Sequence, residues 1–268
     1  MDLLWLCSFL ILGAAVGLLA GLFGIGGGGI MVPVLTLVFS RLAFPAEHIV
    51  HMALATSMAA IVPTALASLR AHHARAAVLW PVVIKMAPGI LLGTFAGTFL
   101  ASRLAAEPLA IFFSVFMALI ALQMIRNHTP KPSRTLPGTV AISGVGAAIG
   151  GVSSLVAIGG GSMTVPFLAW CNVALPTAIG TSAAIGLPIA LAGAGGYLIN
   201  GWGVADLPAN TLGYIYWPAV IAMASASFFS APLGARLAHS LPVALLKKLF
   251  ALLQIGLAVQ MLVTVFGH

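Results

Sequence analysis

The chain has 268 residues, of which 61% are hydrophobic and only 6% are charged. A soluble domain of this length could not cover its surface with so few polar groups, and apolar runs long enough to span a bilayer recur along the chain. The composition therefore predicts an all-α polytopic membrane protein surrounded by the lipid bilayer. The formal net charge of +7 belongs to loops at the membrane surface, so no nucleic-acid partner is expected.

Apolar stretches predict about ten helical elements. In chain order they cover residues 3–23, 29–40, 49–69, 78–101, 109–125, 138–157, 162–170, 176–198, 212–236 and 243–266. Two are too short to span, because a helix over 29–40 would be about 18 Å long against a hydrocarbon core of about 30 Å. Each short element is therefore either part of one broken span or dips into the membrane and returns.

A glycine-rich motif occurs twice and indicates an internal duplication. The matching segments are "IGGGGIMVPVL" at 25–35 with "IGGGSMTVPFL" at 158–168, "ATS" at 55–57 with "GTS" at 180–182, and Trp80-Pro81 with Trp217-Pro218. The chain is therefore predicted to consist of a first membrane repeat, residues 1–137, and a second one, residues 138–268. Each repeat holds about five helical elements.

Loop charges favour one topology of the short elements. If each forms a hairpin with the element before it, most bases face one side and all four acids face the other. The first side holds Arg70, Arg75, Arg126, Lys131, Arg134, Arg236, Lys247 and Lys248, and the second holds Arg41 and Arg103 with Asp2, Glu47, Glu107 and Asp206. Single broken spans would divide the bases evenly instead.

The hairpin topology gives each repeat three full spans plus a glycine-broken hairpin. An odd number of spans makes the two repeats inverted in the membrane, which is typical of secondary transporters. The basic loops are then expected in the cytoplasm, with the N- and C-termini both outside.

The duplicated glycines predict a binding site, since irregular backbone at membrane depth is tolerated where it lines a cavity. Short helices starting at Gly29 and Ser162 would present free backbone N–H groups and the positive end of the helix dipole, which favours an anion. Hydroxyls early in the following helices would add donors. The candidate substrate-binding residues are Gly26, Gly27, Gly28, Gly29, Gly159, Gly160, Gly161, Ser162, Thr56, Ser57, Thr181 and Ser182.

Close helix packing is the alternative role for the glycines of the two loops. It is the expected role of glycines at four-residue spacing, namely Gly13, Gly17 and Gly21 and also Gly89, Gly93 and Gly97. The threonine and serine hydroxyls could equally bond back to the preceding turn of their own helix.

Lys85 is the only charged residue well inside an apolar segment. It either attracts the anion, carries a proton, or extends toward the basic side of the membrane. His51, near the outer start of its helix, either titrates with a proton gradient or has no part in coupling. The acids all fall at ends or loops, which disfavours coupling through buried carboxylates and leaves uniport, exchange and other proton carriers open.

Cys7 and Cys171 are isolated, and neither has a CxxC partner or a histidine at metal-ligand spacing. No disulfide, metal or cofactor is expected from them. The sequence also contains no G-x-S-x-G segment, no HExxH segment and no paired carboxylates, so no enzyme is expected.

The duplicated "GIGGGGIMVP" and "AIGGGSMTVP", each followed by its "ATS" or "GTS" helix, resemble the TauE/SafE family of membrane permeases, named for sulfite export. The resemblance covers the whole chain. It implies a secondary transporter of sulfite, sulfate-like oxyanions or small organosulfonates, with transport mostly outward across a bacterial inner membrane. The glycine loops are the positions to which the resemblance assigns substrate binding. Ser162 stands where the first copy has Gly29, which would make the two half-sites unequal.

Alternating access of the inverted repeats around an anion is the expected mechanism. A passive anion channel on the same loops is the main alternative, and a membrane scaffold or enzyme is a further one. Saturable counterflow distinguishes a carrier from a channel. The small-residue ridges would permit a homodimer without requiring one.

Overall fold

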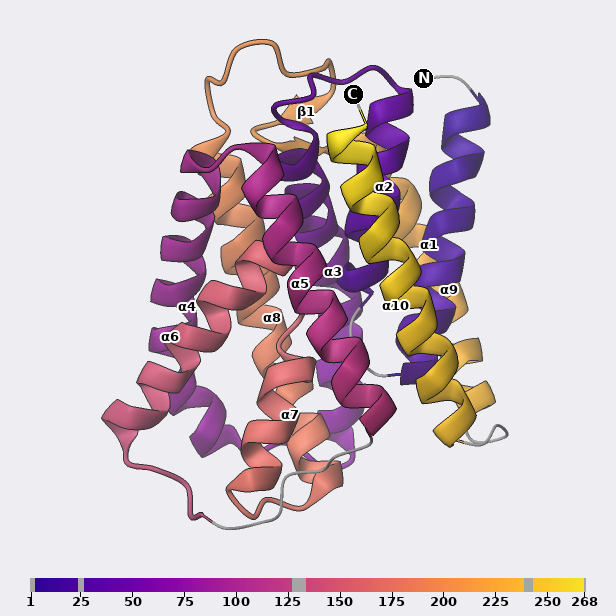
Figure 1. Ribbon diagram of the computed structural model, residues 1–268. Coiled ribbons are helices and arrows are strands. Elements are labelled where there is room, and N and C mark those ends of the chain that lie inside the picture. The colour runs from indigo at the N-terminus through magenta and orange to yellow at the C-terminus, as the bar shows by residue number, and fades with distance from the viewer. Residues whose placement is uncertain (1–2, 24–26, 127–133, 239–242, 268) are drawn as a thin grey trace.

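The computed structural model describes residues 3–23, 27–126, 134–238 and 243–267, and these form ten helices and one short β-hairpin (Figure 1). The elements are α1 (Leu3–Phe23), α2 (Gly28–Arg41), α3 (Ile49–Ala74), α4 (Trp80–Arg103), α5 (Ala106–Arg126), α6 (Thr139–Val156), α7 (Gly161–Trp170), α8 (Leu175–Asn200), β1 (Thr211–Leu212), β2 (Ile215–Tyr216), α9 (Trp217–Ala238) and α10 (Val243–Phe266). Six of these helices are long and apolar enough to cross a membrane. The prediction of an all-α polytopic membrane protein is confirmed.

One predicted helix, over 212–236, begins too early. The structure places the antiparallel strands β1 and β2 there, with Thr211 paired to Tyr216, and α9 begins only at Trp217. Gly213 turns the hairpin with a positive φ of 55°, a conformation that suits glycine and that interrupts a helix. The short strands are apolar, so hydropathy alone does not separate them from the helix that follows.

The helices α3 and α8 pack against each other in the middle of the bundle, and three pairs lie around them: α1 with α9, α4 with α6, and α5 with α10 (Figure 1). The first half of α3, from Ile49 to Ile61, is buried throughout. Large apolar side chains cover the outside instead, with exposed fractions of 72% for Leu92 and 75% for Phe229. Apolar residues thus occupy both the core and the surface that faces lipid.

Glycines let the outer pairs come close, which confirms the packing role predicted for the four-residue spacing. A Cβ on Gly13 would lie 2.6 Å from the Cα of Met223, so α1 and α9 touch through their backbones. In the same way, a Cβ on Gly89 or Gly93 in α4 would collide with a backbone carbonyl of α6. Small residues at such crossings allow close packing of membrane helices.

The two short helices double back on the helices before them. In Figure 1, α1 descends and α2 returns upward, whereas α6 rises and α7 returns downward. The start of α1 and the end of α10 consequently lie at the same end of the bundle, at the top of Figure 1. Of the two arrangements that the sequence allows, a hairpin or a single broken span, the structure shows the hairpin.

Helix contacts correspond between the two halves of the chain. The α1–α9 pair, which joins the two halves, is matched by the α6–α4 pair with the halves exchanged, and α3 contacts α9 as α8 contacts α4. Such paired contacts are what a duplication predicts, and they support division into repeats over 1–137 and 138–268. The repeats themselves stay a prediction.

Candidate functional site

The two glycine loops adjoin inside the bundle. Gly28, the first residue of α2, is buried so tightly that a Cβ there would collide with the carbonyl oxygen of Ala157, which ends α6. The same Cβ would lie 3.2 Å from Cδ1 of Ile61, and a Cβ on Gly159 would lie 3.9 Å from Cγ2 of Ile61. The structure therefore brings the two motifs together beside the centre of α3.

The first loop ends in a helix start that no side chain caps. Gly27 is the N-cap of α2, and its carbonyl accepts the N–H groups of Ile30 and Met31 at 3.1 and 3.0 Å. The N–H groups at the very start of a helix have no carbonyl of the preceding turn to bond to, so those of Gly28 and Gly29 lack an intrahelical acceptor. Gly26, the remaining predicted residue of this loop, lies outside the described residues.

The second loop is shaped differently. Ala157 closes α6 with a φ of 49°, and Gly160, the N-cap of α7, has a φ of 23°. The N–H of Gly161 donates to the carbonyl of Gly159, while that of Thr164 donates to Gly160 at 2.7 Å. No side chain caps α7 either, but one of its first donors is already used within the loop. The two half-sites are therefore unequal in their backbones as well as at Ser162.

Several buried polar atoms around the loops have no hydrogen-bond partner among the described residues. Ser162 and Thr164 of α7 both leave their hydroxyl oxygens unpaired, as does Ser153 near the end of α6. Gln254 of α10 leaves its Oε1 unpaired and faces α2, because a Cβ on Gly29 would lie 2.9 Å from Gln254 Nε2. Such atoms are costly in a dry interior, so they mark a place that a polar ligand or water would occupy.

Sequence reasoning did not identify Gln254, Thr164 or Ser153 as site residues. The available signal was a glutamine in the middle of the apolar helix α10, because polar side chains within membrane spans are rare and often functional.

Two of the four predicted hydroxyl donors, those of Thr56 and Thr181, bond to backbone outside the loops. Thr56 Oγ1 accepts the N–H of Tyr216 at 3.1 Å, and Thr181 Oγ1 accepts the N–H of Leu79 at 2.9 Å. Ser57 is buried with an unpaired hydroxyl oxygen, and Ser182 is buried on α8. The two threonines thus bind backbone of other elements, neither the glycine loops nor the preceding turn of their own helices.

The family model described as sulfite exporter TauE/SafE matches residues 9–261. The chain belongs to the TauE/SafE family. A relative in Haemophilus influenzae, called "Probable membrane transporter protein", is 38% identical over 254 residues, which covers 94% of this chain and 96% of the relative. A relative in Methanocaldococcus jannaschii, called "Probable membrane transporter protein MJ0441", is 28% identical over 247 residues, which covers 88% of this chain and 87% of the relative. No solved structure matches the chain.

Membership of TauE/SafE confirms the resemblance that the duplicated motif indicates. Together with the apolar helices, it makes the protein an integral membrane protein and a membrane transporter. The family and the relatives' names indicate a transporter rather than an enzyme.

Lys85 of this TauE/SafE protein is exposed on the outer face of α4. It lines a groove between α4 and α6 together with Thr139 and Ser143, and no residue of the glycine loops lines that groove. Its side chain is therefore placed to run along the outside of the bundle toward the basic side. A role in attracting the anion has no support from this position.

His51 joins the start of α3 to the end of α4. It is 3% exposed, and its Nε2 lies 3.0 Å from the carbonyl oxygens of both Ala101 and Leu104. Its ring stacks on Tyr214 at a centroid distance of 5.3 Å, while Nδ1 has no partner among the described residues. These contacts give His51 a place at the end of the bundle where the acidic loops lie, away from the glycine loops.

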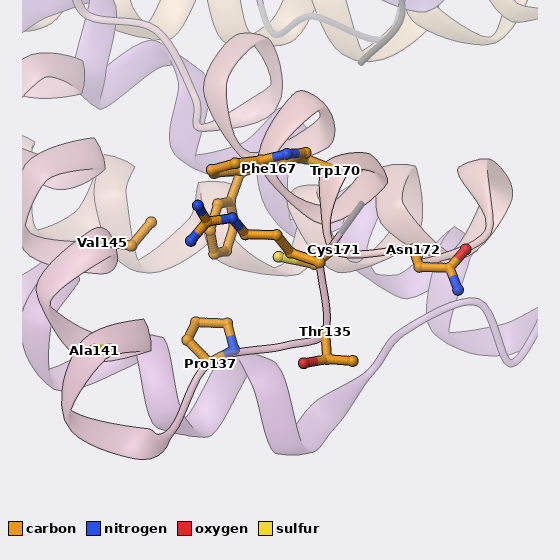
Figure 2. Close-up of a pocket in the computed structure, with 9 residues that line it drawn as sticks. Thr135, Pro137, Ala141, Val145, Phe167, Trp170, Cys171 and Asn172 are labelled. Atoms are coloured by element: carbon orange, nitrogen blue, oxygen red, sulfur yellow. The ribbon is translucent and has the colours of Figure 1, made fainter. Parts of the chain in front are cut away.

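A hollow lies at the foot of α7, as Figure 2 shows. Its volume is about 890 Å³, and its wall includes Phe167 and Trp170 on one side and Thr135 and Pro137 on the other. Cζ of Arg134 lies 4.8 Å from the centroid of the Trp170 ring, a cation–π contact. The sequence identifies Arg134 only as a loop charge, whereas in the structure it is one of the residues that line this hollow.

Proposed function

We propose that this transporter carries a small sulfur-containing oxyanion, of the sulfite or organosulfonate class, out across the bacterial inner membrane by alternating access. The substrate is held between the two glycine loops. Backbone N–H groups at the start of α2 and, to a lesser extent, of α7 bind its oxygens.

The observation that carries this proposal is that Gly28, at the start of α2, meets Ala157, which opens the second glycine loop, and that no side chain caps either α2 or α7. Both helices direct the positive end of their dipoles toward the same region, and glycine allows a ligand to touch the backbone. Donors without side-chain charge suit a weakly basic oxyanion that must be released again. Among the described residues no group of three or more histidines, cysteines or acids could hold a metal ion.

Orientation follows from the basic loops. We place the ends that hold Arg75 and Arg134 in the cytoplasm, and the termini outside. The cation at the foot of α7 then faces the cytoplasm, where it would raise the local concentration of an anion that is to be exported. The other side, with Glu47 and Asp206, would repel the anion after release.

Counterflow in proteoliposomes tests the function. Vesicles loaded with unlabelled sulfite should accumulate radiolabelled sulfite transiently and saturably, with methanesulfonate and sulfate as competitors. Flux without saturation or counterflow would indicate a passive channel instead, and no flux of any anion would contradict the proposal.

Gly159→Ala tests the site with little disturbance of the fold. The new Cβ would meet only Ile61, at 3.9 Å, so the methyl group fits but narrows the space between the loops. We expect sulfite counterflow to fall about tenfold, which corresponds to about 1.4 kcal/mol. Gly186→Ala in α8 is the matched control, because nothing lies within 4 Å of its Cβ position. Equal activity of the two variants, at equal expression, would place the substrate elsewhere.

A further inference from the structure

Gln254 is a buried glutamine that lies against the start of α2, next to the first glycine loop, and its side-chain oxygen is unpaired in the described part of the chain. It is 2% exposed, and its Oε1 has no hydrogen-bond partner among the described residues. A Cβ on Gly29 would lie 2.9 Å from Nε2 and 3.2 Å from Oε1 of Gln254. The amide thus sits directly against the uncapped start of α2, and only glycine at this position leaves room for it.

Packing does not account for a glutamine at this place. Met117 of α5 corresponds to Gln254 in the proposed duplication, and its Sδ lies 3.2 Å from the same Cβ position on Gly29. Met117 is fully buried and fills its side of the space without a polar group. An amide of similar length adds only hydrogen-bonding capacity, and a buried unpaired oxygen costs about 1–3 kcal/mol. The polar group therefore calls for a partner that the described residues do not supply.

The start of α2 and the side-chain oxygen of Gln254 require different groups on a ligand. The start of α2 offers N–H donors and takes an anionic acceptor. The Oε1 of Gln254 is an acceptor and takes a donor. A ligand that satisfies both carries a negative oxygen and an O–H or N–H group within one small molecule.

No acid among the described residues lies near Gln254, and this favours an O–H over an ammonium N–H as the donor group of the ligand. Glu47, Glu107 and Asp206 lie at helix ends or in loops, so no carboxylate among the described residues can balance an ammonium group in the interior. Burying an unpaired ammonium is far more costly than burying a hydroxyl. A singly protonated oxyanion therefore fits better than an aminosulfonate.

We propose that Gln254 is a substrate-binding, specificity-determining residue, whose Oε1 accepts the O–H of a singly protonated oxyanion such as hydrogen sulfite while the start of α2 binds its other oxygens. This inference rests on the proposed function and adds to it the protonation state of the substrate. It also supplies a proton carrier without a membrane carboxylate, because the proton travels on the substrate. Organosulfonates and sulfate, which carry no such proton at neutral pH, bind more weakly.

The test compares three substrates within each variant, so the folded fraction cancels. Proteoliposomes of the full chain are assayed for counterflow of sulfite at mildly acidic pH, where hydrogen sulfite dominates, and for methanesulfonate, which lacks the O–H. Taurine, with its ammonium group, is a third substrate. The wild-type protein should prefer hydrogen sulfite to both others.

Gln254→Met copies the residue on the other side of Gly29. We expect the preference for hydrogen sulfite over methanesulfonate to fall about tenfold, since the acceptor of the O–H is lost. Gln260→Met is the matched control on the same helix, because Gln260 donates to Thr264 at 3.4 Å and not toward the loops. It should keep the wild-type preference.

The outcomes separate the two proposals. Wild-type counterflow with an unchanged preference in Gln254→Met overturns the role of Gln254 and leaves the proposed function standing. A wild-type preference for taurine overturns the assignment of an O–H donor. No oxyanion flux in the wild-type protein overturns the proposed function, and this inference with it.

Discussion

Thr56 and Thr181 each hold a backbone N–H that lies far away in the chain. Thr181 Oγ1 accepts from Leu79, and Thr56 Oγ1 accepts from Tyr216. Both donors come directly before a Trp-Pro helix start, that of α4 in one case and α9 in the other. Each central helix thereby fixes the start of an outer helix at a defined depth.

Removing one of these hydroxyls should loosen an outer helix. Thr181→Val keeps the shape of the side chain but leaves the N–H of Leu79 unpaired, which costs about 1–3 kcal/mol. We expect a lower midpoint of thermal unfolding in detergent. Thr36→Val is the matched control, because the Thr36 hydroxyl bonds to Val32 in its own helix at 2.8 Å, and its loss should shift the midpoint little. Equal shifts in the two variants would contradict the anchoring role.

Sequence patterns identify a polar residue in an apolar segment but not its partner. The "ATS" and "GTS" segments stand out because they are duplicated, yet their threonines bind Tyr216 and Leu79, which no spacing rule connects to them. Gln254 gives a weaker signal in the sequence because it is not duplicated, since Met117 stands at the corresponding position of the first half. Its proximity to Gly29 depends on how α10 packs on α2, and that is a property of the folded chain.

Among the elements, the outer helix pairs depend on bare backbone at their crossings. In α4, a Cβ on Gly93 would collide with the carbonyl oxygen of Ala147 in α6. Backbone atoms cannot move aside as a flexible side chain can, so the helices must separate to admit a larger residue. This close approach fixes how far α6, and the glycine loop that follows it, lies from α4.

Gly93→Ala should therefore destabilise the protein, by about 1–3 kcal/mol for an overpacked site. The matched control is Gly144→Ala on α6, which has nothing within 4 Å of its Cβ position and should be neutral or slightly stabilising, since alanine favours a helix over glycine. Thermal unfolding in detergent compares the two. A stable Gly93→Ala with an unstable Gly144→Ala would show that the α4–α6 crossing is arranged differently.

Helix bounds are largely predictable in this chain because apolar runs and glycine–proline breaks coincide with the physical limits of the helices. The predicted 3–23 and 243–266 agree with α1 and α10. The hairpin before α9 is not predictable in this way, because its strands are apolar and only Gly213, with its positive φ, distinguishes them from a helical start. The backbone conformation at Gly213 determines where the helix begins, and hydropathy carries no information about that conformation.

For the whole molecule, the doubling back of α2 and α7 puts both ends of the chain on one side (Figure 1). The connection from α4 to α5 lies at that end, and the connection from α3 to α4 lies at the opposite one. The bases in the second connection should keep it in the cytoplasm, since basic loops resist translocation. The fold shows that the two connections lie at opposite ends of the bundle. Which of them faces the cytoplasm is a prediction from the loop charges.

Labelling of single cysteines tests the orientation of the whole bundle. In a variant with Cys7 and Cys171 replaced by serine, Ala105→Cys and Ala74→Cys each introduce a thiol at an exposed position near a helix end. A membrane-impermeant maleimide added to intact cells should label the cysteine at position 105 and not the one at position 74, and permeabilisation should make both reactive. The reverse pattern would invert the orientation. In that case Arg134 and the hollow at the foot of α7 would face outward, where a cation attracts anions for uptake, so the same experiment also decides between export and import as the direction that the electrostatics favour.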